Sequence, residues 1–252
     1  MGNAISVSKL SFSYSKENSL LEDVSFDIDN GGIYAIFGPN GCGKTTLLKC
    51  LLNLLKYQGT VALFNKDIRS ISHKELAESI AFVPQFINLP TNFYVRDYII
   101  LGLATSLKFY QSPSKDDYKA VDEVSQKLGL MEIVNKKMDE LSGGEAQIVS
   151  VARALVQDSK VIILDEPMAS LDFGNQGRLL KLIKQINSEG KTIIFTTHNP
   201  NHINFLNCNT IVMRKGKIVK TSKGLDKETV ESLYDDVKTI NNEDSTAFIW
   251  KD

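Results

Sequence analysis

The sequence predicts an α/β fold in which the short strands of a mostly parallel sheet alternate with helices. Two strands carry the prediction, because "VIIL" within residues 160–167 and "TIIF" within residues 191–198 are short and wholly apolar. Strands of this kind bury both faces, which is typical of a parallel sheet covered by helices. Between them, residues 177–190, "GRLLKLIKQINSEG", have the spacing of a helix.

The amino-terminal part predicts a separate antiparallel β subdomain. From Ile5 to Ile28 apolar and polar residues alternate, as at Val24 and Phe26, which is the pattern of two half-buried antiparallel strands. A β-rich run at Ile33–Phe37 then leads through a glycine-rich turn into a helix. The buried side of that helix is expected to hold Leu47, Leu48, Leu51, Leu52 and Leu55.

Three further segments extend the β structure. Residues 60–68, "TVALFNKDI", and residues 80–85, "IAFVPQ", predict strands, with a helical turn at 74–80 between them. Near the carboxyl end, residues 210–220, "TIVMRKGKIVK", predict a hairpin that turns at the Lys-Gly pair 215–216.

The middle of the chain predicts a helical subdomain inserted into the core. Strand signals stop between about residues 86 and 159, where residues 94–110 and 115–130 have helical spacing instead. One face of the second helix is expected to hold Tyr118, Val121, Val124 and Leu128. We expect one nucleotide-binding domain over residues 1–224 and a short polar tail over residues 225–252.

Composition narrows the class of protein. The chain has 252 residues, 42% of them hydrophobic, which is ample for a core, and its net charge of −1 gives no footprint of a nucleic-acid partner. Cys42, Cys50 and Cys208 show no paired spacing, which suits a reducing compartment such as the cytoplasm. Since no apolar run approaches the roughly 20 residues that span a bilayer, we expect any membrane role to be peripheral.

Residues 38–45, "GPNGCGKT", fit the phosphate-binding loop pattern Gly-x-x-x-x-Gly-Lys-Thr and lie between a predicted strand and a predicted helix. The glycines let successive backbone N–H groups wrap phosphate oxygens, and the start of the helix adds partial positive charge. Lys44 supplies a full positive charge, and the Thr45 hydroxyl can bind Mg²⁺. The alternative is a flexible glycine-rich turn, which the flanking strand and helix make the weaker interpretation.

A second motif is an apolar strand that ends in two acids, Asp165 and Glu166. A strand that buries both faces would not end so unless the acids face a ligand. Asp165 then fits as a holder of Mg²⁺, directly or through water, and Glu166 as a carboxylate that polarises an attacking water. The alternative is a solvated strand end.

Gln85 and His198 each follow a predicted core strand. Ligands bind beyond the carboxyl ends of the strands in open parallel α/β sheets, so both side chains are candidates for the same site. His73 and His202 lie in polar segments and are expected to be solvated.

The segment "LSGGE" places Ser142, Gly143 and Gly144 at the start of a predicted apolar helix. Glycine costs about 1 kcal/mol against alanine in a helix interior, so its use here indicates a close approach of the backbone to another group. The helix start forms a second anion site. Because the chain already has a complete phosphate loop, this second site is expected to serve the nucleotide of another molecule.

Together these motifs resemble the ATP-binding subunits of ABC (ATP-binding cassette) transporters. The phosphate loop, Gln85, "LSGGE", "VIILDE", "SLD" at 170–172 and His198 follow in that family's order and spacing, from Val7 to about Lys220. The resemblance implies the ABC ATPase fold, ATP and Mg²⁺, and a head-to-tail dimer. In that dimer each ATP lies between the phosphate loop of one chain and the Ser142-Gly143-Gly144 segment of the other.

The resemblance also implies roles for individual residues. Tyr14 would stack on adenine, Gln85 would touch Mg²⁺ or the water, and Asp172 would couple the two sites. His198 would hold the γ-phosphate, and the catalytic set becomes Glu166, His198, Gln85 and Lys44, with Thr45, Gln85 and Asp165 for the metal. The nucleotide contacts become Tyr14, Gly38, Pro39, Asn40, Gly41, Cys42, Gly43, Lys44, Thr45, Thr46, Ser142, Gly143 and Gly144.

Several positions depart from the common family pattern. Cys42 replaces a small or hydroxyl residue, Glu145 stands where glutamine is common, and Ala146 and Ile148 replace residues that are frequently basic. None of these changes removes a catalytic group. Cys42 could make the loop sensitive to thiol reagents if its thiolate is stabilised there.

Within the family the chain looks most like the ATPases of metal-chelate importers, which serve iron-siderophore, haem, cobalamin and related molybdate or tungstate systems. Zinc or manganese importers are the next alternative. The resemblance implies membrane permease subunits as partners, a substrate-binding protein as an indirect partner, and a place on the cytoplasmic face of the membrane. A soluble ABC ATPase without a transport role, such as an iron-sulfur assembly factor, is the alternative of another class, and a phosphate-loop kinase would leave "LSGGE" unexplained.

Overall fold

A computed structural model describes residues 2–15, 19–85, 92–105, 111–234, 237–242 and 245–250. The chain divides into two compact units. The first unit comprises Met1–Ile71 and Leu182–Asp252, and the second comprises Ser72–Lys181. The chain leaves the first unit once and returns to it, so the second unit is an insertion in the sequence of the first.

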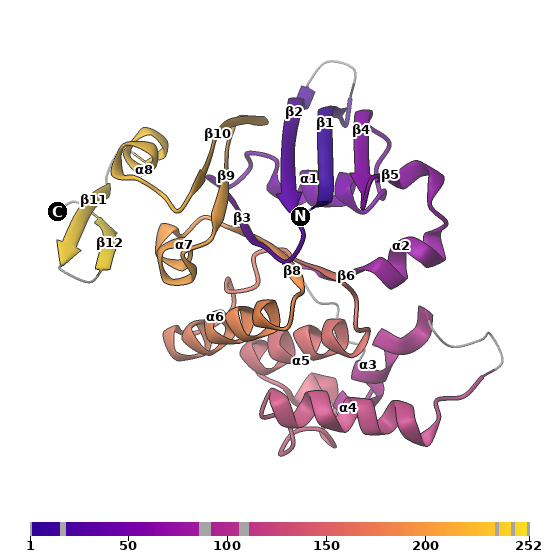
Figure 1. The fold of residues 1–252 in the computed structure, drawn as a ribbon. Helices are drawn as coiled ribbons and strands as arrows, with labels where there is room; N and C mark the ends of the chain where they lie inside the picture. Colours follow the sequence, from indigo (N-terminus) through magenta and orange to yellow (C-terminus); the bar gives the residue numbers. More distant parts are fainter. Residues whose placement is uncertain are drawn as a thin grey trace. The chain divides into compact units, whose positions relative to one another are not determined.

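The amino-terminal strands form an antiparallel sheet in the order β2-β1-β4-β5 (Figure 1). These strands are β1 (Asn3–Ser13), β2 (Ser19–Asp29), β4 (Gln58–Leu63) and β5 (Lys66–Asp67). The predicted antiparallel subdomain is confirmed. The single strand predicted at 60–68 is wrong, because Phe64 and Asn65 have positive φ angles of 48° and 65° and turn the chain into a short hairpin.

The parallel part of the first unit is centred on β3 (Ile33–Phe37), which lies between β8 (Thr192–Thr197) and β9 (Asn209–Arg214) and runs parallel to both. The strand β10 (Lys217–Lys223) pairs with β9 in the opposite direction. The predicted hairpin turn at 215–216 is confirmed, since both of its residues have positive φ.

The helix after the glycine-rich loop is shorter than the leucine pattern predicts. The helix α1 spans Lys44–Leu51, and Asn53 adopts a left-handed conformation with φ of 55°. Leu47, Leu48 and Leu51 are buried as expected, but Leu52 and Leu55 lie beyond the helix and are only half-buried. The leucine pattern continues beyond Leu51, but the backbone conformation near Asn53 ends the helix, so the pattern overestimates its length.

Residues 225–252, expected as a short polar tail, contain regular structure. They form α8 (Lys227–Leu233) and a hairpin of β11 (Val237–Asn242) with β12 (Ser245–Trp250). The buried side chains of Val230, Val237 and Phe248 anchor these elements. Because most of this segment is polar, its short apolar run at 247–250 is a weak strand signal.

The second unit contains the helices predicted between the strands. It holds β6 (Ile80–Val83) parallel to β7 (Val161–Leu164), and the helices α2 (His73–Ser79), α3 (Val95–Ile100), α4 (Lys115–Lys127) and α5 (Gly143–Val156). The helix α6 (Phe173–Ser188) crosses the boundary between the units in sequence, and α7 (Pro200–Leu206) belongs to the first unit. Short 3₁₀ turns lie at Ile68–Ser70, Leu101–Thr105 and Met138–Glu140. Two parts of the predicted helical subdomain, residues 86–91 and 106–110, fall outside the described residues.

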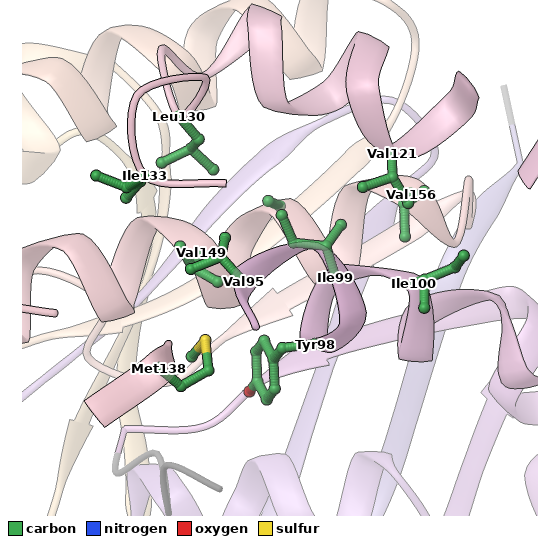
Figure 2. Packing of buried hydrophobic residues seen from close by; sticks show 11 residues of the cluster. Val95, Tyr98, Ile99, Ile100, Val121, Leu130, Ile133, Met138, Val149 and Val156 are labelled. Carbon is green, nitrogen blue, oxygen red and sulfur yellow. The ribbon is translucent and has the colours of Figure 1, made fainter. Parts of the chain in front are cut away.

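A hydrophobic cluster between α3, α4 and α5 forms the core of the second unit. Figure 2 shows its side chains converging, among them Val95, Ile99, Val121 and Val149. Burying an aliphatic side chain of this size stabilises a fold by roughly 1.5–3 kcal/mol. On the predicted face of α4, Val121 is buried and Val124 and Leu128 pack on the cluster, but Tyr118 stays exposed at its edge.

Candidate nucleotide-binding and hydrolysis site

The phosphate loop connects β3 to α1 in the first unit. The loop needs glycine at two places for different reasons. A Cβ atom at Gly38 would lie 2.3 Å from the carbonyl oxygen of Met213, and Gly43 has a φ of 105° that side chains disfavour. The loop is further fixed where the Gly38 N–H donates to the Thr197 carbonyl, 3.4 Å away.

Lys44 is buried beneath this loop. Its Nζ donates to the carbonyl oxygens of Gly38 at 2.8 Å and Pro39 at 3.2 Å. The helix α1 also begins at this loop. Its first backbone hydrogen bond runs from the Leu47 N–H to the Gly43 carbonyl, so the N–H groups before Leu47 form the helix start. A lysine charge and a helix start therefore meet at the loop, which is the arrangement that binds phosphate.

The three cysteines are buried thiols. The Cys42 sulfur fills the space under the loop, where a Cβ atom at Gly38 would lie 2.9 Å from it. Burial raises the pKa of Cys50 to about 11 and that of Cys208 to about 12. Burial of Cys42 likewise opposes access by thiol reagents, contrary to the reactivity that sequence left open.

Tyr14 presents its ring beside the loop. The side chain is 64% exposed, while its Oη lies 3.4 Å from the Thr46 hydroxyl and its ring meets Phe12 edge to face at 4.7 Å. These two contacts hold the ring and leave a face open. An open aromatic face held in place is suited to stacking on a base.

His198 follows β8 directly and is exposed. Four residues later, His202 is buried, so the expectation that it is solvated is wrong. The Asn-Pro pair 199–200 begins α7 and turns His202 inward, where its Nδ1 lies 2.9 Å from the Thr197 hydroxyl and its Nε2 lies 3.3 Å from Asn199 Nδ2.

The hydrogen bonds assign the proton on His202. The Asn199 Oδ1 accepts from the Asn201 N–H, so the Asn199 amide nitrogen faces His202 Nε2, which must accept. The proton then sits on Nδ1 and is donated to Thr197. Burial, and then the nearby His198, lower the pKa of His202 to about 4, so the ring is neutral at physiological pH.

The acid pair lies in the second unit at the end of β7. Asp165 is buried, and its N–H donates to the Val83 carbonyl at 2.9 Å. Glu166 has a positive φ of 42°, and Gln85 Nε2 donates to its carboxylate at 3.5 Å. The structure therefore brings together Gln85 and Glu166, which are far apart in sequence.

The "LSGGE" segment forms a complete helix cap. The Ser142 hydroxyl accepts from the Glu145 N–H, and the Glu145 carboxylate accepts from the Ser142 N–H at 2.8 Å. The Ser142 N–H and then the Ser142 hydroxyl lower the pKa of Glu145. Glutamate at this position, one of the departures from the family pattern, thus stabilises the start of α5.

The twin glycines face no close neighbour. A Cβ atom at Gly143 would meet nothing within 4 Å, and at Gly144 the nearest atoms, on Leu171 and Asn175, would lie at an ordinary 3.5 Å. Both residues also have ordinary φ angles. Within the described residues, this chain's own packing therefore does not require glycine at either position.

Asp172 accepts hydrogen bonds at the start of α6, and the residue after it, Phe173, is highly exposed. Its two carboxylate oxygens accept from the N–H and the Nδ2 of Asn175, each at 2.8 Å. Phe173, the first residue of α6, has 92% of its side chain exposed. A single exposed aromatic residue is common on protein surfaces and does not by itself mark an interface.

The site residues thus fall into two groups. The loop 38–46, Tyr14 and His198 belong to the first unit, and Gln85, Asp165, Glu166, the segment 142–144 and Asp172 belong to the second. The sequence missed the residues that surround His198, namely Thr197, Asn199, Asn201, His202 and Tyr234. The Asn-Pro helix start at 199–200 is the signal that could have placed His202 inside.

The loop and the acid-ended strand define a phosphate-loop nucleotide-binding protein. The family model for ABC transporters matches residues 21–169. Two curated relatives match over nearly their whole length. The molybdate import ATP-binding protein MolC of Haemophilus influenzae is 34% identical over 93% of this chain and 89% of its own. A probable iron chelatin transport ATP-binding protein of Helicobacter pylori is 33% identical over 92% of both chains. The chain belongs to the ABC transporter family.

Solved structures agree with the sequence relatives. An inward-facing metal-chelate type ABC transporter, described as putative, has a chain with a TM-score of 0.85 and 31% identity, over 99% of this chain and 98% of that one. The ABC transporter cassette MJ0796, solved as a dimer, has a TM-score of 0.78 and 28% identity, over 87% of this chain and 98% of that one. The predicted ABC ATPase fold is confirmed.

The chain is the ATP-hydrolysing subunit of a transport system, as the sequence predicted. Its relatives are transport proteins, which excludes the assembly-factor alternative. Among the described residues, no helix is long and apolar enough to cross a membrane.

Proposed function

We propose that the chain powers the import of a metal chelate or a related oxyanion. Three relatives that match over nine-tenths of the chain are named for molybdate, iron chelatin and iron(3+)-hydroxamate import or transport. A manganese transport relative, MntB of Halalkalibacterium halodurans, matches only 79% of the chain. The names therefore favour chelates and oxyanions over the manganese alternative.

In this proposal one ATP binds at the phosphate loop of each chain. Residues 38–46 hold the phosphates, with the Lys44 charge placed among the loop carbonyls and the helix start. Tyr14 offers its open face to adenine, and His198 holds the γ-phosphate from the end of β8.

The observation that carries the proposal is the open pair of glycines at the start of α5. Since the chain's own packing does not require Gly143 or Gly144, the absence of side chains there serves a molecule from outside. The backbone N–H groups at this helix start suit a phosphate, and the Ser142 hydroxyl, which donates to the Glu145 carboxylate at 2.8 Å, can turn to join them. We assign that phosphate to the ATP held by a second copy of the chain, in a head-to-tail dimer.

The residues assigned to the metal fit Mg²⁺. Thr45, Gln85 and Asp165 provide a hydroxyl, an amide carbonyl and a carboxylate, and Mg²⁺ prefers such oxygen ligands. The Gln85 amide nitrogen is turned to Glu166, which leaves its carbonyl oxygen as the ligand atom. When bound, the ion neutralises phosphate charge.

Hydrolysis in this proposal relies on positioning and on charge. Glu166 orients and polarises the water, and Gln85 keeps the carboxylate in place. Lys44, together with Ser142 and Gly144 of the second copy, stabilises charge on the γ-phosphate. Closing and reopening of the dimer then acts on membrane permease subunits that dock on the helical second unit at the cytoplasmic face, with a substrate-binding protein as an indirect partner.

The test of the hydrolytic site is Glu166→Gln. If Glu166 polarises the water, the variant should bind ATP normally and hydrolyse it roughly 10²–10⁴-fold more slowly, which is the usual size of general-base catalysis. Glu132→Gln, at an exposed glutamate of the same unit, is the matched control and should keep its turnover. Near-normal hydrolysis by Glu166→Gln would remove the assignment.

A further inference from the structure

The carboxyl-terminal segment, meaning α8 with the β11–β12 hairpin, contacts the loop that carries His198. The Asn201 side chain and the backbone of Phe248 form a reciprocal pair, in which Asn201 Nδ2 donates to the Phe248 carbonyl at 3.1 Å and Asn201 Oδ1 accepts from the Phe248 N–H at 2.9 Å. The side chain of Asn201 thus pairs with β12 as a neighbouring strand would. Figure 1 shows α7 beside this hairpin.

A second hydrogen bond reaches His198 itself. The Tyr234 hydroxyl donates to the His198 carbonyl oxygen at 3.2 Å, and the Tyr234 ring lies 6.0 Å from that of Phe37, at the end of β3. A pocket of about 250 Å³ lies between these contacts and is lined by His198, Tyr234 and Phe248. The segment therefore holds the loop through its backbone and leaves space beside the His198 side chain.

Two hydrogen bonds connect Asn201 to the residues on either side of His198. The Asn201 N–H donates to Asn199 Oδ1 at 3.0 Å, and the Asn199 N–H donates to the Thr197 hydroxyl at 3.0 Å. His198 stands between these two tied residues. Since both neighbours are fixed, a displacement of Asn201 would move the histidine.

We propose that the carboxyl-terminal segment clamps the His198 loop, and that Asn201 is the positioning residue through which the clamp acts on ATP hydrolysis. The proposal rests on the proposed role of His198 at the γ-phosphate. The clamp lies outside residues 21–169, which carry the family match.

The test compares Asn201→Ala with Ile249→Ala in the full-length protein. Misplacing a catalytic group by about 1 Å can cost up to 10²-fold in rate, so loosening the loop should lower kcat of Asn201→Ala about tenfold. The affinity for ATP should stay unchanged, because the phosphate loop is untouched. Ile249→Ala keeps both backbone hydrogen bonds of Phe248 and changes only the neighbouring exposed side chain, so it should keep kcat.

Hydrogen exchange supplies a second measurement. The Phe248 amide should exchange slowly in the wild type and faster in Asn201→Ala, since its acceptor is removed. If Asn201→Ala does not fold, Asn201→Asp replaces it, which keeps the acceptor but loses the donor and should show the same loss of kcat. Unchanged kcat in the folded variant, or an equal loss in Ile249→Ala, would overturn the clamp.

His198→Ala separates the two proposals. If His198→Ala retains full activity, the assigned role of His198 fails. If His198→Ala is inactive while Asn201→Ala hydrolyses ATP at the wild-type rate, the role of His198 stands and the clamp fails.

Discussion

At the scale of single residues, His202 is the histidine whose surroundings are most altered by folding. The residue is 8% exposed, and Asn199 Nδ2 already faces its Nε2 as a donor, so a proton added at Nε2 would oppose that N–H. The folded protein therefore binds this proton less well than the unfolded chain. Stability becomes linked to pH through one side chain.

The pH dependence of stability has a defined sign. The pKa of His202 is about 4 in the fold and 6.5 when unperturbed, so the unfolded chain takes up the proton first as the pH falls. The contribution of His202 is complete above about pH 6.5 and is lost toward pH 4, by up to roughly 3 kcal/mol. Urea unfolding at about pH 7 and about pH 5 should show a smaller loss in His202→Gln than in the wild type. Equal losses would contradict a neutral, buried His202.

The local patterns of the site could be predicted because each one is contained in a few consecutive residues. The loop ending in Lys44 and Thr45, and the strand ending in Asp165 and Glu166, are examples. The contact between Gln85 and Glu166 needs the fold, although their common place at strand ends anticipated it. The surroundings of His198 could not be predicted, because they depend on Asn201 meeting the backbone of Phe248, which leaves no trace in residue type.

At the scale of elements, the helices of the second unit depend on the cluster between α3, α4 and α5. Ile99 lies in the cluster and is 0% exposed, whereas Leu101, two residues on, is 43% exposed. Both side chains are aliphatic and of equal size. Only the first fills space between helices.

This difference predicts unequal effects of truncation. Ile99→Ala should lower the free energy of unfolding by roughly 2–5 kcal/mol, because it removes buried contacts and leaves a cavity. Leu101→Ala, the matched control, should change it by about 0.5 kcal/mol or less. Denaturant unfolding of both variants measures the difference. Equal costs would mean that the cluster is not packed as described.

Elements also show where sequence reasoning failed. The hairpin at 210–220 was predicted because two apolar runs flank a Lys-Gly turn, and the structure confirms it. The hairpin of β11 and β12 was missed, because β11 is mostly polar and the apolar run of β12, at 247–250, is short. The burial of Phe248 depends on α7, which lies far away in the sequence.

At the scale of the whole molecule, the proposed dimer makes a prediction about association. Glu166→Gln should shift from monomer to dimer in light scattering when Mg²⁺ and ATP are added, because the bound nucleotide would join two copies. The double variant that also carries Ser142→Arg should not show this shift, because a long side chain would lie where the nucleotide of the second copy must approach.

The control for that variant is Ser114→Arg. Ser114 caps α4 with the same reciprocal pattern that Ser142 uses at α5, so either change should cost its helix about 1 kcal/mol. Only the change at Ser142 should prevent the dimer. A protein that binds ATP and stays monomeric without the Ser142 change would count against the shared nucleotide.

The burial of all three native thiols has a practical consequence for observing these motions. Cys42, Cys50 and Cys208 lie inside the fold, so maleimide dyes should leave the native protein unmodified. One cysteine introduced at an exposed position of α4, such as Lys119, would then take up a single fluorophore without removal of any native cysteine. Energy transfer between donor-labelled and acceptor-labelled copies would follow their approach and separation during each round of turnover.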